Sequence, residues 1–254
     1  MKILLQTTIE RFNGEWDVAK FSKLAQVLGD DGHVVVCRNR EPGDDGSDPV
    51  LSTLEDSDFD QLWLMAVDRG NALSPKDVRS ILRFRERGGG ILTAREDENI
   101  GSSLLNLGTL GAVNHFKTYN RTRSTRSKTG LPGPAWRRVV ALEPVHEVLR
   151  SSKSPTGVLE YLPAHPHDGA ISVPEHLPYA RAIAATAADG EQEMIDLAIA
   201  IENEQSIDGH ACGRAIAVSS IHHFADPDWD MIRDPASLEA HKDYARNIAR
   251  WLSC

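Results

Sequence analysis

The stretch that most constrains the fold runs from residue 85 to residue 97. It reads Arg-Glu-Arg-Gly-Gly-Gly-Ile-Leu-Thr-Ala-Arg-Glu-Asp. The three glycines predict the end of a helix, because glycine is favoured where a helix stops. The apolar run at residues 91–94 predicts a short strand, and three charged residues follow it directly. In an open parallel sheet, ligands bind at the carboxyl ends of the strands. The stretch therefore predicts both a strand and one edge of a candidate site.

Apolar runs on either side of this stretch predict an alternation of strands and helices. Strands are expected at residues 2–8, 33–37, 60–68 and 91–94, and helices at residues 16–28, from Ser74 onwards and, as a short one, at residues 99–110. Ser74, Pro75 and Asp77 suit the first turn of a helix, where serine caps free N–H groups and proline is tolerated. Such alternation predicts a parallel sheet with helices on both faces.

The second half of the chain predicts shorter strands and a final helix. Strands are expected at residues 137–142, 158–162, 170–173, 180–186, 194–202 and 214–219, and a helix from Asp234 or Pro235 to Leu252. We expect one α/β domain over residues 1–254: a doubly wound, mostly parallel sheet with an antiparallel excursion near the C-terminus. Residues 111–138 predict a mobile insertion loop. Its cations could close over a phosphate or carboxylate, or form a solvated loop.

Composition limits the partners. The chain has 254 residues and a net charge of -9, which argues against binding to nucleic acid or a membrane surface. No apolar run approaches the roughly 20 residues of a membrane span. The three cysteines, Cys37, Cys212 and Cys254, are far apart, which favours a reducing, cytoplasmic setting. We expect a small-molecule ligand, and a homo-oligomer is left open.

Two segments resemble the ThuA-like branch of the class I glutamine-amidotransferase-like superfamily. Residues 84–92 are similar to its glycine-triplet entry into a central strand. Residues 213–222 are similar to its Gly-Arg-strand-His segment, and Asn247 and Trp251 to its Asn-x-x-x-Trp helix end. Order and spacing fit over most of the chain. The resemblance implies a flavodoxin-like sheet.

The turn after the central strand departs from the superfamily pattern. The resemblance implies a cysteine at this turn in active amidotransferases, and often a histidine in ThuA-like members. This chain reads Ala94-Arg95-Glu96-Asp97 there. Ordinary glutaminase chemistry is therefore disfavoured, because neither a thiolate nor an adjacent hydroxyl is offered.

The predicted strand ends supply the candidate catalytic and substrate-binding residues. Arg95 could hold an anionic group bidentately, while Thr8 and Asp68 could bind hydroxyls. Glu96 could be a general base if burial raised its pKa, and His222 could exchange a proton near neutral pH. The alternative is that Arg95 and Glu96 form a structural ion pair at a strand end.

The histidines raise the question of a metal. His165 and His167 are one residue apart, so their side chains point the same way on an extended segment. Together with His222 they could hold Zn²⁺ or another divalent ion, and His115 is a further metal or substrate-binding candidate. The alternative is that they are loop imidazoles bonded to the backbone. Because adjacent strand residues face opposite ways, at most one of His222 and His223 should face the crevice. No other cofactor is expected.

Three functions stay open from the sequence. The first is a ThuA-like protein that binds or acts on a small polar metabolite, such as a sugar derivative. The second is a catalytically inactive amidotransferase-like module for binding or assembly. The third is a metal-dependent hydrolase or isomerase that uses the histidine cluster.

Overall fold

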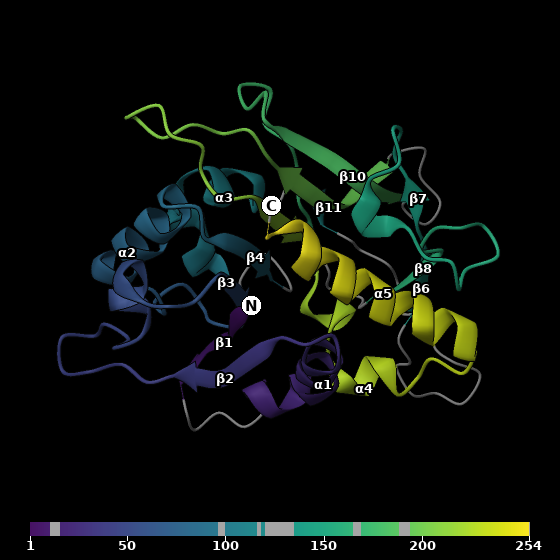
Figure 1. Ribbon diagram of the computed structural model, residues 1–254, viewed down its shortest axis with the longest axis horizontal. Helices are drawn as coiled ribbons and strands as arrows, with labels where there is room; N and C mark the ends of the chain where they lie inside the picture. The colour runs from purple at the N-terminus through teal and green to yellow at the C-terminus, as the bar shows by residue number, and fades with distance from the viewer. Residues whose placement is uncertain are drawn as a thin grey trace.

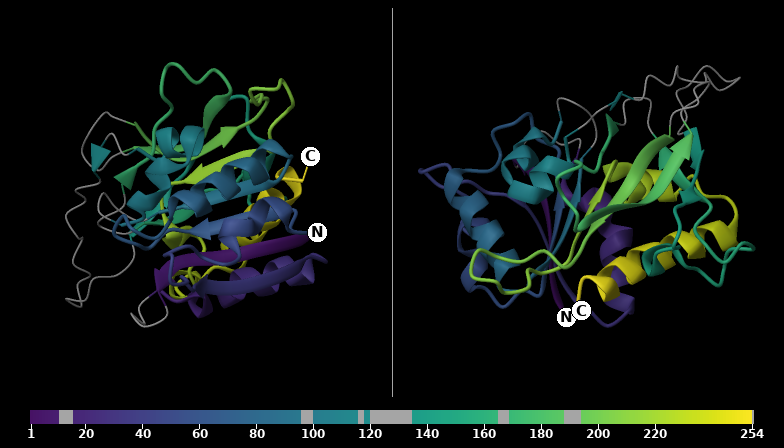
Figure 2. Two further views of the ribbon diagram at one scale, coloured as in Figure 1. Left: turned by 90° about the vertical axis from the view of Figure 1, so that its left-hand side faces the viewer. Right: turned by 90° about the horizontal axis from the view of Figure 1, so that it is seen from above.

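The computed structural model describes residues 1–10, 16–95, 100–115, 118–119, 135–164, 169–187 and 194–253. Within these residues, one large sheet runs through the molecule, with helices packed on both of its faces (Figures 1 and 2). The two ends of the chain lie side by side (Figure 2), where the Ser253 hydroxyl contacts the Met1 sulfur.

The sheet has eight strands in the order β2-β1-β3-β4-β12-β11-β10-β7. Pairing from β2 through β12 is parallel, and β11, β10 and β7 are added antiparallel. The parallel part has the flavodoxin-like order. Both the doubly wound sheet and its antiparallel excursion are therefore confirmed. The strands are β1 (Lys2–Glu10), β2 (Val34–Arg40), β3 (Gln61–Met65), β4 (Gly90–Ala94), β7 (Val140–Ala141), β10 (Ala180–Ala187), β11 (Met194–Ile201) and β12 (Ala215–Val218).

The central strands are buried on both faces, which explains their continuous apolar sequences. Alternate residues of one strand pack into two different cores. In β3, Trp63 and Met65 join one core, while Leu62 and Leu64 join the other. The helices α1 (Ser22–Asp30) and α5 (Pro235–Trp251) cover the first face. The second is covered by α2 (Pro75–Glu86), α3 (Gly108–Val113) and the 3-10 turns η2 (Leu51–Asp56) and η3 (Ser102–Asn106).

Local signals set the start of α2 as expected. The Ser74 side chain accepts from the Asp77 amide at 3.1 Å, and the Asp77 carboxylate accepts from the Ser74 amide at 2.9 Å. This reciprocal capping satisfies two N–H groups that a helix N-terminus leaves free. The helix expected between Asn99 and Leu110 is instead divided into η3 and α3. Gly108 has a positive φ of 54°, which interrupts a regular helix at that point.

The strand expected at residues 137–142 is also divided. Its first part, β6 (Ala135–Arg138), pairs with β8 (Tyr161–Ala164) in a separate two-stranded ribbon. Its second part, β7, joins the main sheet beside β10. The chain passes from ribbon to sheet at Val139, whose amide bonds the Glu160 carbonyl at 2.8 Å. A second small ribbon pairs β5 (Thr118–Tyr119) with β9 (Gly169–Ala170).

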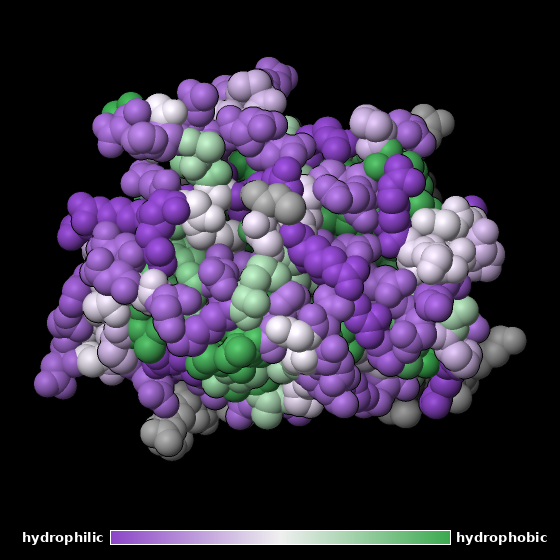
Figure 3. All heavy atoms as spheres, in the orientation of Figure 1, coloured by the Kyte–Doolittle hydropathy of each residue, from purple (hydrophilic) through white to green (hydrophobic). Residues whose placement is uncertain are grey.

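The exposed surface seen in Figure 3 is mostly polar. Hydrophilic residues cover most of the face in Figure 3, with apolar residues showing mainly below its centre. No helix among the described residues is both long and apolar enough to span a membrane.

Of the insertion expected at residues 111–138, the ends belong to α3 and β6, and residues 116–117 and 120–134 lie outside the described part.

Candidate functional site

The carboxyl ends of β1, β3, β4 and β12 meet at one edge of the sheet. The order β1-β3-β4-β12 and the parallel pairing place the candidates Thr8, Asp68, Arg95 and His222 along this edge. Neighbouring segments are bonded directly past the strand ends, since the Ile221 amide donates to the Arg95 carbonyl at 3.1 Å. We call this row the strand edge. The candidate Glu96 belongs to residues 96–99, outside the described part.

Asp68 uses its carboxylate to hold the strand edge together. One oxygen accepts from the hydroxyls of Thr8 at 2.8 Å and Ser103 at 2.7 Å. The other accepts from the amides of Gly70 at 2.7 Å and Ser103 at 3.3 Å. Thr8 Oγ1 in turn accepts from the Val67 amide at 2.8 Å. Both side chains therefore satisfy polar groups of the protein itself.

Arg95 is buried and faces the main chain of the segment that follows it. Its side chain is 2% exposed. Nε donates to the Ile100 carbonyl at 3.1 Å, and Nη1 donates to the Asn114 carbonyl at 2.7 Å. Gly101 makes room for it, because a Cβ there would stand 2.6 Å from the Arg95 Cβ. The guanidinium thus links the end of β4 to Ile100 and to the end of α3.

His222 forms a pair with an aspartate that sequence reasoning missed. His222 lies in the 3-10 turn η5 (Ile221–His223), and its Nδ1 is 2.8 Å from Oδ2 of Asp228. Asp228 belongs to α4 (Asp226–Trp229). The Trp16 ring meets the imidazole edge-on, with centroids 5.1 Å apart. A carboxylate at Nδ1 fixes the ring and favours the tautomer in which Nε2 can accept a proton. The only sequence signal was an aspartate six residues after the histidine.

Arg95 and His222 leave the strand edge on opposite faces of the sheet. The Arg95 guanidinium lies toward Ile100 and Asn114, beside the core covered by α2 and α3. The His222 ring packs against Trp16, which borders the core covered by α1 and α5. Adjacent strand ends therefore do not bring these two side chains into one hollow.

His222 and His223 are both buried, at 5% and 1% exposed, and the alternation on which the expectation that at most one faces the crevice was based does not apply to them. That expectation assumed a strand, whereas both residues belong to η5. Burial lowers the pKa of His223 well below its usual value, and lowers the pKa of His241 to about 4. Both imidazoles are therefore neutral at pH 7.

The remaining candidates do not gather into a site within the described residues. His115 is exposed, and its hydrogen bonds are made by its main chain: the amide donates to the Ala112 carbonyl at 3.4 Å, and the carbonyl accepts from the Ser172 hydroxyl at 3.2 Å. His165 and His167 lie in the undescribed segment 165–168, as do most cations of the expected insertion in segment 120–134. Among the residues that are described, no group of three His, Cys, Asp or Glu side chains could hold a metal ion.

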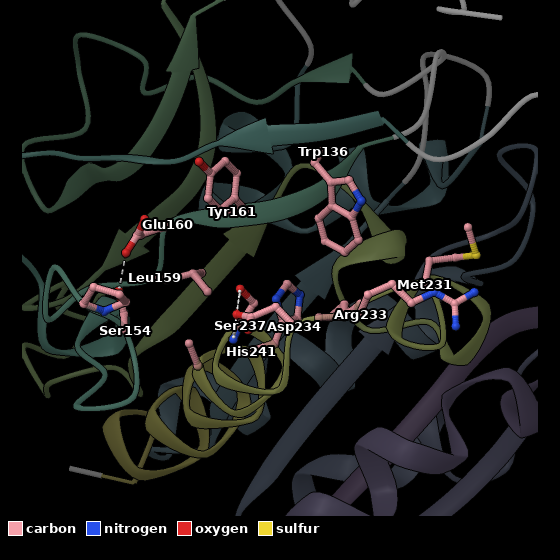
Figure 4. A pocket seen from close by; sticks show the side chains of 13 residues that line it. Trp136, Ser154, Leu159, Glu160, Tyr161, Met231, Arg233, Asp234, Ser237 and His241 are labelled. Atoms are coloured by element: carbon pink, nitrogen blue, oxygen red, sulfur yellow. Dashed lines mark hydrogen bonds between the residues drawn. The ribbon is translucent and has the colours of Figure 1, made fainter. Parts of the chain in front are cut away.

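A cleft of about 570 Å³ opens between the β6–β8 ribbon and the start of α5 (Figure 4). We call it the ribbon cleft. The ribbon forms one wall, and α5 with the segment before it forms the other. Its lining includes Trp136, Leu159, Tyr161, Met231, Ile232 and His241. Sequence reasoning did not find this cleft, because its walls come from segments about 100 residues apart.

Comparison with known proteins identifies the fold. No family model matches the sequence, and a search of curated proteins finds no match. Among solved structures, the mmIFT52 N-terminal domain is similar over 99% of this chain and 97% of that one, with 14% identity and a TM-score of 0.59. A ThuA-like protein from Parabacteroides merdae ATCC 43184 is similar over 99% of this chain and 89% of that one, with 15% identity and a TM-score of 0.54.

These likenesses show a ThuA-like fold, of the kind that the sequence resemblance implied. At sequence identities of 14% and 15%, the two structures show the fold of this chain and nothing about its activity. A third structure, the glutaminase domain of Trypanosoma brucei CTPS with bound acivicin, has 10% identity and a TM-score of 0.44 over 99% of this chain and 96% of that one, too low to add to the argument.

Proposed function

We propose that this protein is a binding or assembly module on a ThuA-like fold that does not catalyse the cysteine-dependent glutaminase reaction. The observation that carries the proposal is the buried Arg95. The resemblance implies that active amidotransferases have their nucleophile at this turn. Here the position is taken by a guanidinium whose donors serve the carbonyls of Ile100 and Asn114.

The described cysteines support the same proposal. Cys37 lies within β2, three strands from β4 in the sheet. Cys212 precedes β12 and so stands near the amino ends of the parallel strands, away from Arg95. Burial raises the pKa of both thiols, which lowers the fraction of nucleophilic thiolate. Both are unpaired, which supports a reducing, cytoplasmic setting as part of the proposal.

A glutaminase assay on the full chain tests the proposal. We expect no ammonia release from glutamine above the buffer rate. We also expect no labelling by an electrophilic glutamine analogue in peptide mass maps, apart from slow labelling of the cysteines Cys37, Cys212 and Cys254. The Cys37→Ser and Cys212→Ser variants identify that background. Glutamine hydrolysis by the parent that disappears in His222→Gln would overturn the proposal.

A second candidate function rests on the His222–Asp228 pair. A histidine held at Nδ1 by a carboxylate is suited to proton transfer on a small polar metabolite, such as a sugar derivative. In this alternative Glu96 would be the second proton-transfer group. A thermal-shift screen of sugars and carboxylates would find the ligand, because a compound that binds the native state raises its melting temperature. Turnover that survives both His222→Gln and Asp228→Asn would remove this candidate.

A further inference from the structure

We infer that the ribbon cleft binds a flat apolar ring that carries a hydrogen-bond donor, such as an amino- or hydroxyl-substituted aromatic compound. This deepens the proposed binding role, because it names a site and a class of ligand. It requires neither the strand edge nor the His222–Asp228 pair.

The first support is a concentration of exposed apolar side chains. Trp136, Tyr161 and Met231 are 39%, 43% and 42% exposed, and all three line this cleft. In the ribbon, Trp136 pairs with Pro163 and Arg138 with Tyr161. Trp136 and Tyr161 therefore occupy diagonal positions on one face of the ribbon. Exposed apolar side chains gathered in one place mark binding sites, and aromatic rings favour offset or edge-on contact with another ring.

The second support is a buried polar atom beside the cleft. His241, from the first turns of α5, lines the wall opposite the ribbon (Figure 4). Its ring is 2% exposed, and Nε2 has no hydrogen-bond partner among the described residues. A buried polar atom without a partner carries a free-energy cost, which a ligand donor close to it would reduce. The Leu159 and Ala240 side chains in the same lining are apolar.

The third support is the distribution of charge at the cleft. The hydrogen bonds that Glu160 accepts from Ser154 and Thr156 both end on Oε1. Those that Asp234 accepts from Ser237 both end on Oδ2. In each carboxylate, these hydrogen bonds use one oxygen. Hydrogen bonds from neighbouring hydroxyls hold the pKa of both carboxyls below the usual value, so both are ionised at pH 7.

These charges select between ligands of the same shape. Among the described residues that line the cleft, the two carboxylates of Glu160 and Asp234 outnumber the guanidinium of Arg233. An ammonium or hydroxyl group can donate to Glu160 or Asp234, whereas a carboxylate on the ligand would be repelled. The cavity of about 570 Å³ lies within the range of small-molecule sites and can take a two-ring compound with a short arm.

Isothermal titration of the full chain with three indole compounds tests the inference. Tryptamine carries an ammonium, 5-hydroxyindole a hydroxyl, and indole-3-acetate a carboxylate. We expect tryptamine and 5-hydroxyindole to bind, and indole-3-acetate to bind about tenfold more weakly than tryptamine. The double variant Trp136→Ala/Tyr161→Ala should weaken tryptamine about tenfold or more, through loss of both rings.

Matched variants separate this site from general surface effects. Val140→Ala removes an exposed apolar side chain outside the cleft and should leave tryptamine affinity unchanged. Glu160→Gln should reduce the preference for tryptamine over indole-3-acetate, and Asp234→Asn should do the same, because asparagine still caps the helix. The inference is overturned if no indole compound binds, if the double variant binds tryptamine as the parent does, or if the acid binds as tightly as the amine. Glutamine hydrolysis, by contrast, would overturn the proposed function and would not affect the inference that the ribbon cleft binds an aromatic ligand.

Discussion

The strand edge and the ribbon cleft use polar side chains in opposite ways. At the strand edge, Asp68 accepts four hydrogen bonds from protein groups, and Arg95 donates to main-chain carbonyls. At the ribbon cleft, the hydrogen bonds that Glu160 accepts from Ser154 and Thr156, and those that Asp234 accepts from Ser237, end on one oxygen of each carboxylate. Charged residues that follow buried strands need partners in any fold, and here the protein provides them. Polar atoms left beside an apolar cleft are the better guide to a ligand.

The largest effect should come from Arg95. Arg95→Met keeps the apolar stem and removes two charge-assisted hydrogen bonds, so we expect the free energy of unfolding to fall by roughly 3–5 kcal/mol. Urea denaturation followed by circular dichroism measures it. Arg83→Met, which removes an exposed ion pair with Glu55, should cost about 1 kcal/mol or less. If Arg95→Met were as stable as the parent but no longer bound a ligand, Arg95 would be a binding residue. The contrast between the strand edge and the ribbon cleft would then not hold.

Acid should destabilise the fold through its buried neutral histidines. Burial lowers the pKa of both His146 and His241 from 6.5 to about 4. The unfolded chain therefore binds protons that the folded chain does not, so stability is complete above pH 6.5 and falls as the pH drops toward 4. Each residue should contribute a loss of the order of 3 kcal/mol.

Denaturation midpoints between pH 7 and pH 4.5 measure this loss. His241→Gln should flatten the pH dependence, while His210→Gln, at an exposed position, should leave it unchanged. An identical slope in His241→Gln and the parent would show that His241 accepts a proton in the folded state.

Thr8 should have a smaller effect on stability and none on the cleft. Thr8→Val removes the donor to Asp68 and the acceptor of the Val67 amide, at a cost of about 2 kcal/mol. Tryptamine affinity should not change, because the ribbon cleft shares no residue with this network. Thr53→Val, on the exposed side of η2, is the matched control. A parallel loss of tryptamine affinity in Thr8→Val would mean that the two regions are coupled.

The smallest effect is expected at His115. Its imidazole is exposed, and the residue is held by its main chain, which bonds to the Ala112 carbonyl and the Ser172 hydroxyl. His115→Ala should change the free energy of unfolding by no more than about 0.5 kcal/mol. Melting temperatures with and without any ligand found by screening give the measurement. If a ligand raised the melting temperature of the parent but not that of His115→Ala, His115 would again be a candidate substrate-binding residue.

Local patterns were sufficient for most of the fold. The apolar runs around Trp63 and Leu92 indicated strands, and Ser74 with Asp77 indicated the start of α2. These features depend on residues a few positions apart, so their physical causes are present in the sequence itself. The resemblance added the flavodoxin-like order. The continuous strand expected over residues 137–142 was wrong. Whether each part of this segment joins the ribbon or the main sheet depends on which strand, β8 or β10, lies beside it.

By itself, the sequence determined where the central strands lie, where α2 begins, and that no cysteine stands in the residues directly after β4. Only the tertiary structure decided that Arg95 serves main-chain carbonyls, that Asp228 holds His222, and that Trp136 and His241 face one cleft. The reason is that a buried polar group is satisfied by whichever atoms the packing of distant elements places within about 3 Å of it. No local pattern carries that information.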